Sequence, residues 1–263
     1  MKDKILVFIP CYNCAPQITR VLNQFDKKNS SYFYEILVLD NGSKDNTVSA
    51  AIAAAKNVDN ISVAIGKNQA NYNLGGSHKA AFKYANANSF SHVAVLHGDD
   101  QGNINDLIPV IQRQSHHLQD ACLGARFMSG SKLTGYSYFR TYGNRIFNLL
   151  FTLGTGNNIK DLGSGLNIFN TKAIENLNIT QYADDLKFNV YLLLGMLEQQ
   201  MKIEYFPISW REEDQISNVK MTSQAINTLQ LLIESKARKK IFWEKDHRAI
   251  AHQDYKFDVV YRK

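Results

Sequence analysis

The chain is poor in cysteine and proline, and it has no long hydrophobic run. It contains three cysteines and four prolines among 263 residues. Three thiols cannot all pair, and an odd count without a secretion signal favours reduced thiols, so we expect a cytoplasmic protein. The longest apolar runs, Ile5 to Ile9 and Val190 to Leu194, are far shorter than the roughly 18 to 20 residues that cross a bilayer, so no transmembrane span is expected.

The chain also lacks the patterns of nucleic-acid-binding and zinc-binding proteins. It has no zinc finger, RNA-binding aromatic signature or long arginine-rich tract, so we expect no nucleic-acid partner. Cys11 and Cys14 form a C-x-x-C pair, but no second pair completes a zinc site. The net charge of +6 then leaves an anionic membrane surface or phosphorylated substrates as expected partners.

Short apolar runs alternate with helical stretches over the first hundred residues. The runs are rich in Val, Ile and Leu, the pattern of strands covered on both faces of a parallel sheet. They are Ile5 to Ile9, Glu35 to Leu39, Ile61 to Ile65 and His92 to Leu96. The helical stretches are Pro16 to Phe25, Val48 to Lys56 and Ser77 to Ala87. This order predicts an α/β fold, a doubly wound and mostly parallel sheet with helices on both faces.

Polar loops follow these strands, at the edge where ligands bind in such sheets. Asp40 can accept hydrogen bonds from a ribose or a base, or else cap the turn that follows it. The glycines Gly75 and Gly76 precede a helix, where backbone amides can approach a phosphate. In "HGDDQ", Asp99 and Gln101 alternate along an extended segment, and their oxygens suit Mg²⁺ or Mn²⁺ bridging a substrate diphosphate, with Asp100 facing away.

The second half of the chain is less regular. We expect helices over Asp184 to Gln199 and Ser223 to Trp243, with a strand at Lys202 to Trp210 between them. The region Tyr136 to Leu153 mixes aromatic and basic residues, which favours either a helix in a lipid headgroup layer or a core helix. The basic run Ser235 to Arg248 is open to two similar readings, contact with anionic lipid or a solvated helix.

Four loop motifs occur in the order found in one enzyme family. With "IPCYN", "VLDNGSKDNT", "NYNLGG" and "HGDDQ", the chain resembles family 2 glycosyltransferases of the GT-A fold, in particular the branch of dolichyl or polyprenyl phosphate sugar synthases. The resemblance runs over about residues 4 to 222 and includes "LGARF", "DLGSGLNIF" and "PISWREEDQISNVKM". It implies a GT-A catalytic domain over residues 1–222, followed by a basic helical extension over residues 223–263.

The resemblance also implies a role for individual residues. It implies that the nucleotide is bound by Pro10, Tyr12, Asn13, Asp40, Asn41, Gly75, Gly76 and His97. It implies that Asp99 and Gln101 bind Mn²⁺ or Mg²⁺ and that Asp99, Arg126 and Arg211 are catalytic. The acceptor phosphate is expected to contact Arg140, Asn144 and Lys220. Three positions depart from the family pattern, because His97 and Asn41 stand where acids are usual and Cys14 replaces a glutamate. Which of the two metals binds is left open.

Family membership implies an inverting transfer from a nucleotide-sugar donor. A hydroxyl acceptor would need a general base, whereas a phosphate is already anionic. The helix containing Asn189 has lost the family's acids, and the arginine register favours a lipid phosphate, so we expect a polyprenyl phosphate acceptor at the inner face of the membrane. Asp161 is an alternative candidate base, or else it caps the turn that follows it. The alternatives are a saccharide hydroxyl acceptor and a nucleotide-sugar-binding protein without turnover. A membrane-anchored partner or a homo-oligomer, and the donor's base and sugar, are left open.

Overall fold

The four apolar runs near the start of the chain form neighbouring parallel strands, as predicted. The computed structural model describes residues 3–213, 221–251 and 253–263. The strands are β1 (Ile5–Cys11), β2 (Glu35–Asp40), β3 (Ser62–Asn68) and β4 (His92–Leu96), paired in the order β3-β2-β1-β4. All residues of β1, β2 and β4 are buried. Strands covered on both faces need apolar side chains on both, which explains why these runs do not alternate with polar residues.

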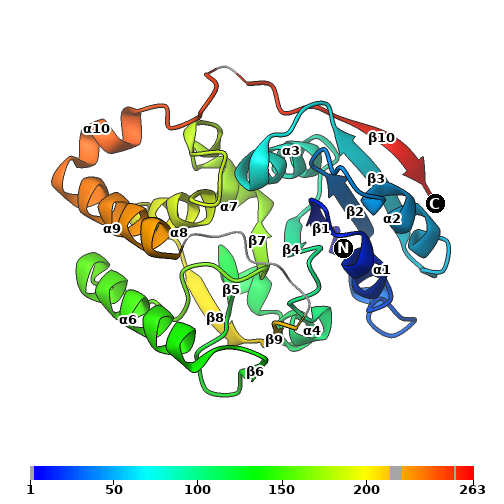
Figure 1. Ribbon diagram of the computed structural model, residues 1–263, viewed down its shortest axis with the longest axis horizontal. Helices are drawn as coiled ribbons and strands as arrows, with labels where there is room; N and C mark the ends of the chain where they lie inside the picture. The colour runs from blue at the N-terminus through cyan, green and yellow to red at the C-terminus, as the bar shows by residue number, and fades with distance from the viewer. Residues whose placement is uncertain (1–2, 214–220, 252) are drawn as a thin grey trace.

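Helices cover the two faces of this sheet (Figure 1). They begin with α1 (Ala15–Leu22), α2 (Thr47–Ala55) and α3 (Asn73–Ala87). Side chains of β1 alternate between the two hydrophobic cores, with Phe8 on the α3 side and Val7 on the side of α1 and α2. The doubly wound arrangement predicted from the sequence is therefore confirmed, and the loops after β1, β2, β3 and β4 meet at one edge of the sheet.

An antiparallel strand joins the two halves of the sheet. The order continues β4-β7-β5-β8, with β5 (Ala121–Ala125), β7 (Leu166–Asn170) and β8 (Ile203–Pro207). β7 runs antiparallel to both neighbours, and Leu166 at its start pairs with Leu96 at the end of β4. The segment 161–165 that precedes β7 is thereby brought to the edge where the β4 loop lies.

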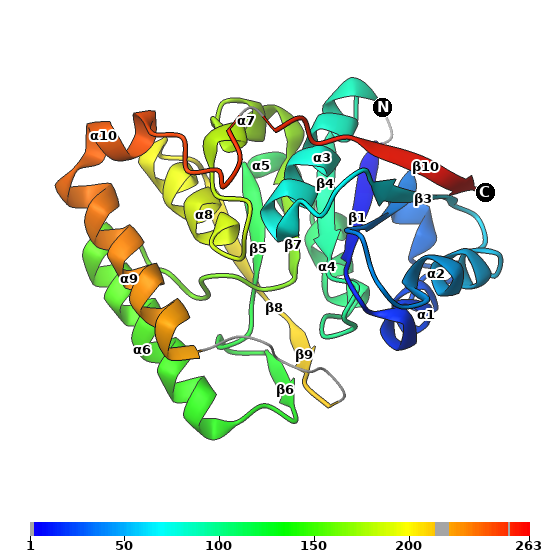
Figure 2. The same ribbon diagram turned by 45° about the horizontal axis from the view of Figure 1, so that its top comes forward.

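The remaining helices follow β4 in the chain. They are α4 (Ile108–Gln112), α5 (Ser115–Leu118), α6 (Tyr138–Thr155), α7 (Thr171–Glu175), α8 (Phe188–Glu198), α9 (Met221–Ala237) and α10 (Lys239–Glu244), with 3-10 turns at Ser30–Tyr32, Ile104–Asp106 and Ile179–Gln181. The short strands β6 (Lys132–Thr134) and β9 (Ser209–Arg211) pair with each other. Both views show α6 alongside α9 (Figure 2). Over the described ranges, every helix is too short or too polar to cross a bilayer.

The C-terminal segment is helical only in its first part. The sequence predicts a basic helical extension over residues 223–263, and α9 and α10 agree with it, but Phe257–Arg262 forms β10. β10 pairs antiparallel with β3, the strand that would otherwise be the sheet's edge. A Cβ on Gly66 would lie 2.6 Å from the Phe257 ring, so glycine permits this close packing. The end of the extension is therefore part of the main sheet.

Candidate active site

Asp99 and Gln101 lie together in the loop that follows β4. The Gln101 backbone N–H donates to Asp99 Oδ1 at 3.3 Å. Burial raises the pKa of the Asp99 carboxyl to about 6, because the charged form loses solvation. The Gln101 side chain donates from Nε2 to Glu212 Oε1 at 3.4 Å. The two predicted metal ligands are thus adjacent at the ligand-binding edge.

Asp100 anchors this loop to two other elements. Its backbone has a left-handed φ of 59°, and its carboxylate is buried. Arg20 of α1 donates to Asp100 Oδ2 at 2.7 Å, and Arg211 of β9 forms an ion pair with the same oxygen. Arg211 Nε also donates to the Asp100 carbonyl at 2.8 Å. Arg211, predicted to be catalytic, therefore holds the Asp99 loop in position.

His97 places a ring nitrogen at the same edge. Its Nε2 is buried and has no hydrogen-bond partner among the described residues. Burial lowers the pKa of the imidazole to about 4, so His97 is neutral at pH 7. A Cβ on Gly165 would lie 2.8 Å from the ring, so glycine there makes room for His97. A buried nitrogen without a partner is the kind of group that a ligand completes.

Arg126 and Asp161 form a buried two-point ion pair. Arg126 Nε and Nη2 donate to the two carboxylate oxygens at 2.8 Å each, and the Arg126 backbone N–H adds a third bond at 2.9 Å. Burial opposes the charge on Arg126, but the Asp161 carboxylate raises the pKa of the guanidinium overall. Both Asp161 oxygens are engaged, which corrects the expectation that this residue is a candidate general base. The sequence did not predict that Asp161 lies beside Arg126, because this contact depends on the antiparallel strand β7.

Glu212 is a residue of the site that sequence reasoning missed. It pairs with Arg140 near the start of α6 and accepts from Gln101, so it links α6 to the Asp99 loop. The Arg140 guanidinium also lies over the Tyr136 ring, 4.8 Å from its centre. Asn144 Nδ2 donates to the Tyr136 hydroxyl at 2.9 Å. The predicted acceptor residues Arg140 and Asn144 are therefore together, whereas Lys220 lies outside the described residues.

The loops that were predicted to bind the nucleotide are joined to one another by hydrogen bonds. Asn13 Oδ1 accepts from the Lys44 backbone N–H at 2.8 Å, and the Asn13 N–H donates to Ser43 Oγ at 2.9 Å. Asp40 accepts from the backbone of its own loop, including the Ser43 N–H at 3.2 Å. Tyr12 is 49% exposed and offers a ring on which a base can stack. Pro10 joins these loops to the metal loop, because its carbonyl accepts from Gly98 N–H at 3.1 Å.

Two of the predicted nucleotide-binding features have structural roles instead. The backbone N–H groups of Gly75 and Gly76 donate to the Asp184 carbonyl at 2.6 and 3.3 Å. A Cβ on Gly75 would lie 2.6 Å from the Ala183 carbonyl oxygen, so Gly75 allows α3 to pack closely against the segment before α8, whereas a Cβ on Gly76 would meet Tyr72 and Tyr255. This corrects the expectation that the glycine amides approach a phosphate. Asn41 is likewise engaged, since its Oδ1 accepts from Asn68 and from the Tyr72 N–H.

The oxygen donors at this edge suit a hard divalent cation. Asp99 supplies a carboxylate and Gln101 an amide oxygen, and both are ligand types that Mn²⁺ and Mg²⁺ accept. Within the described ranges, Asp99 is not part of a convergent group of three acids, histidines or cysteines. The residues therefore fit a cation whose remaining ligands come from a nucleotide diphosphate and water.

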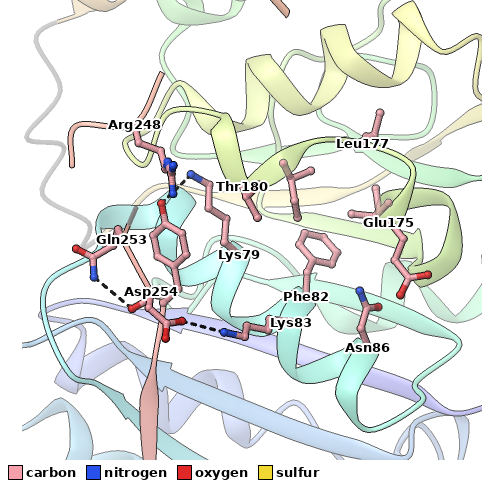
Figure 3. A pocket seen from close by; sticks show the side chains of 13 residues that line it. Lys79, Phe82, Lys83, Asn86, Glu175, Leu177, Thr180, Arg248, Gln253 and Asp254 are labelled. Carbon is pink, nitrogen blue, oxygen red and sulfur yellow. Dashed lines mark hydrogen bonds and ion pairs between the residues drawn. The ribbon is translucent and has the colours of Figure 1, made fainter. Parts of the chain in front are cut away.

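A separate cavity lies between α3, α7 and the segment before β10. Its volume is about 390 Å³, and Lys79, Lys83 and Arg248 line it (Figure 3). Each of these cations is paired: Lys79 with Asp184, Lys83 with Asp254 and Arg248 with Asp246. The location of this cavity is separate from the loops that surround Asp99.

Comparison with known proteins finds relatives among polyprenyl-phosphate sugar transferases. Undecaprenyl-phosphate 4-deoxy-4-formamido-L-arabinose transferase of Serratia proteamaculans (strain 568) is 29% identical over 174 residues, covering 65% of this chain and 50% of that protein. Dolichyl-phosphate beta-glucosyltransferase of Saccharomyces cerevisiae is 27% identical over 231 residues, covering 79% of this chain and 67% of that protein. The chain thus spans about half the length of the undecaprenyl-phosphate transferases that it matches.

Solved structures share the fold. Glucosyl-3-phosphoglycerate synthase of Mycobacterium tuberculosis, in complex with Mn²⁺, UDP and phosphoglyceric acid, superposes with a TM-score of 0.65 at 13% identity, over 98% of this chain and 86% of that one. The predicted GT-A fold is confirmed. Residues 6–177, more than half of the chain, match the model of a single sequence family. The chain therefore belongs to glycosyl transferase family 2.

Proposed function

We propose that the protein is an inverting glycosyltransferase that moves a sugar from a nucleotide diphosphate to a polyprenyl phosphate. Family membership supports the reaction, and the names of two relatives, an undecaprenyl-phosphate arabinose transferase and a dolichyl-phosphate glucosyltransferase, support the acceptor. In one displacement, the acceptor oxygen forms a bond to the anomeric carbon while the bond to the nucleotide diphosphate breaks. The electron pair of that bond leaves with the diphosphate.

The residues of the edge divide this work between them. Tyr12, Asn13 and Asp40 would hold the nucleoside end of the donor, and Asp99 with Gln101 would hold Mn²⁺ or Mg²⁺. When bound, the cation supplies positive charge that offsets the charge developing on the leaving group. Arg126, fixed by Asp161, adds a preorganised guanidinium that needs no reorientation during the reaction.

The carboxylates near the Asp99 loop favour a phosphate acceptor over a hydroxyl. Asp100, Asp161 and Glu212 each form an ion pair with an arginine. The oxygens of these carboxylates accept from guanidinium groups and are not free to take a proton from a hydroxyl acceptor, which would need a general base. A phosphate acceptor requires no proton removal, and Arg140 stands near it at the start of α6.

The outward face of α6 is the observation that carries the proposal. Helices at a protein surface normally bury their apolar stripe, but α6 exposes its own. The exposed side chains are Tyr138, Phe139, Tyr142, Ile146, Leu149, Leu150 and Leu153, with Phe139 81% exposed. Asn148 and Phe151 are buried on the other side, which excludes the reading of this region as a core helix. The same helix reaches the Asp99 loop through Arg140 and Glu212.

An exposed apolar stripe of this length marks a contact surface, and a lipid headgroup layer suits its aromatic residues. α9, the helix beside α6, also exposes the apolar side chain of Ile233. The basic run that includes Lys239 and Lys240 follows α9, and basic residues favour an anionic leaflet. We therefore propose that α6 lies in the membrane surface and delivers the lipid phosphate to Arg140.

Replacing Phe139 and Leu153 together with serine is expected to weaken binding to phosphatidylglycerol vesicles by at least about tenfold. Burying one such side chain contributes roughly 1.5–3 kcal/mol, and neither contributes to the core, so the unfolding midpoint should change little. Vesicle co-sedimentation measures the effect. Leu118→Ser is the matched control, because Leu118 is 69% exposed but belongs to α5. Equal binding by the parent and the double variant would contradict a lipid role for α6.

The proposed reaction is tested by following a radiolabelled sugar. After a thermal-shift panel has identified the preferred nucleotide sugar, the labelled donor is incubated with Mn²⁺ and undecaprenyl phosphate vesicles. Label that enters the organic phase supports the proposal, whereas label in a water-soluble saccharide indicates a hydroxyl acceptor. Metal-dependent nucleotide binding without transfer to any acceptor would indicate a binding protein instead.

A further inference from the structure

Two histidines and an aspartate meet at the edge of the sheet opposite Asp99. Asp3 precedes β1, and His116 with His117 belongs to α5, which precedes β5. β4 begins at His92 on this side and ends before the Asp99 loop on the other. The two edges are therefore separated by about 16 Å, the length of a five-residue strand. Nothing in the proposed transfer reaction uses this cluster.

The ligand atoms converge on a single oxygen. His116 Nε2 lies 3.1 Å and His117 Nε2 3.0 Å from Asp3 Oδ2. The three atoms lie within 4.8 Å of one another. The two rings are 4.2 Å apart between centroids, so adjacent residues direct their ring nitrogens to the same side. Sequence reasoning missed this convergence because Asp3 lies far from the histidines in the chain, 113 positions before His116.

Both segments that carry these side chains are held by the start of β4. Beside Asp3, the Lys4 backbone N–H donates to Ser91 Oγ at 3.2 Å, and the Ser91 N–H donates to the Lys4 carbonyl at 2.9 Å. His92 donates from Nε2 to the His116 carbonyl at 2.9 Å. Ser91, just before β4, and His92, its first residue, therefore fix both sides of the cluster, and such support is what a metal centre needs to keep its ligands oriented.

We propose that Asp3, His116 and His117 form a binding site for a zinc-class divalent cation. Two imidazole nitrogens and one carboxylate oxygen are a three-ligand set that zinc accepts, with water in the fourth position. Small rotations bring the three atoms around an ion at about 2.0–2.2 Å from each. The ion then replaces the contacts of both histidines with Asp3.

Access and selectivity follow from the surroundings of the cluster. The side chain of His116 is only 1% exposed, but those of Asp3 and His117 are 27% and 43% exposed, so an ion can enter from solvent. Imidazole nitrogen binds zinc more strongly than it binds Mg²⁺ or Mn²⁺. The site is therefore chemically distinct from the oxygen-rich edge at Asp99, and its ion would tie the segment before β1 to α5.

Titration of the full chain with Zn²⁺ under reducing conditions tests the proposal. We expect one bound Zn²⁺ and a rise in the unfolding temperature, because a ligand that binds only the folded state stabilises it. His117→Gln and Asp3→Asn should each weaken Zn²⁺ binding by more than about tenfold, since even outer-shell changes reach that range. His117 is the better target than His116, because removing a buried ring would itself disturb packing.

Two matched variants separate this site from other sources of binding. Asp59→Asn removes an exposed acid elsewhere and should bind Zn²⁺ like the parent, as should Asp99→Asn, which alters only the transfer site. Retained Zn²⁺ affinity in His117→Gln and Asp3→Asn would overturn the proposal and indicate that the cysteine thiols bind Zn²⁺ instead. Loss of Zn²⁺ binding in Asp99→Asn would also overturn it. Because the readouts are affinity and unfolding temperature, failure of the proposed sugar transfer would leave this test unaffected.

Discussion

Replacing Asp99 with asparagine is expected to lower kcat/KM for sugar transfer by about 10²- to 10³-fold, the range found when one preorganised electrostatic group is removed. Asparagine keeps the shape of the side chain but not its charge. Asp99 is the carboxylate proposed to hold the cation at the donor diphosphate, and Gln101 alone offers only a neutral amide oxygen. Transfer assays at saturating and limiting donor, with Mn²⁺ varied, measure the loss.

The dependence of the loss on Mn²⁺ tests the role of Asp99 as directly as the size of the loss does. If Asp99 acts through a cation, Asp99→Asn should also weaken Mn²⁺-dependent binding of the nucleotide, while binding of the nucleotide without metal changes little. The unfolding free energy should not fall, because burial already disfavours the charge of this carboxylate in the folded state. Asp59→Asn serves again as the control. Parent-like transfer by Asp99→Asn would rule out the assignment of Asp99 and, with it, the proposed metal site.

The parts of the site that lie in the loops after β1, β2 and β4 could be predicted because they depend on local patterns. A buried strand followed by a polar loop is readable from a few residues, and parallel strands bring their carboxyl ends to one edge. Asp40 and Asp99 were found in this way. The family resemblance added Arg126 and Arg140, whose positions no local pattern determines.

The remainder of the site depends on pairings between distant segments. Asp161 meets Arg126 because β7 inserts antiparallel between β4 and β5, and β-α alternation predicts no such strand. Glu212 meets Arg140 because β9 lies near the start of α6. The glycine pair illustrates the opposite error: a motif suggested a phosphate loop, but the amides of Gly75 and Gly76 donate to the Asp184 carbonyl, and Gly75 packs closely against residues 183–188. Glycine can be required by a phosphate-binding motif or by close packing, and the sequence alone does not distinguish the two requirements.

Removing the carboxylate of Asp161 is expected to produce the largest loss of stability. Asp161→Asn leaves the buried Arg126 guanidinium without its counter-charge, and breaking one partner of a buried pair costs about 3–5 kcal/mol. Urea unfolding monitored by fluorescence measures this difference. Asp185→Asn is the matched control, because the pair of Asp185 with Lys187 is largely exposed and should contribute less than about 1 kcal/mol.

A double variant separates the structural role of this pair from its role in transfer. Arg126→Met in the Asp161→Asn background removes the unpaired charge, so much of the lost stability should return, as it does when buried ion pairs are replaced by apolar groups. Transfer should stay low, because the guanidinium proposed to contact the donor diphosphate is absent. Near-parent transfer by a folded double variant would mean that Arg126 supports only the packing between β5 and the segment before β7, and that the leaving group is stabilised by the cation and other residues of the edge.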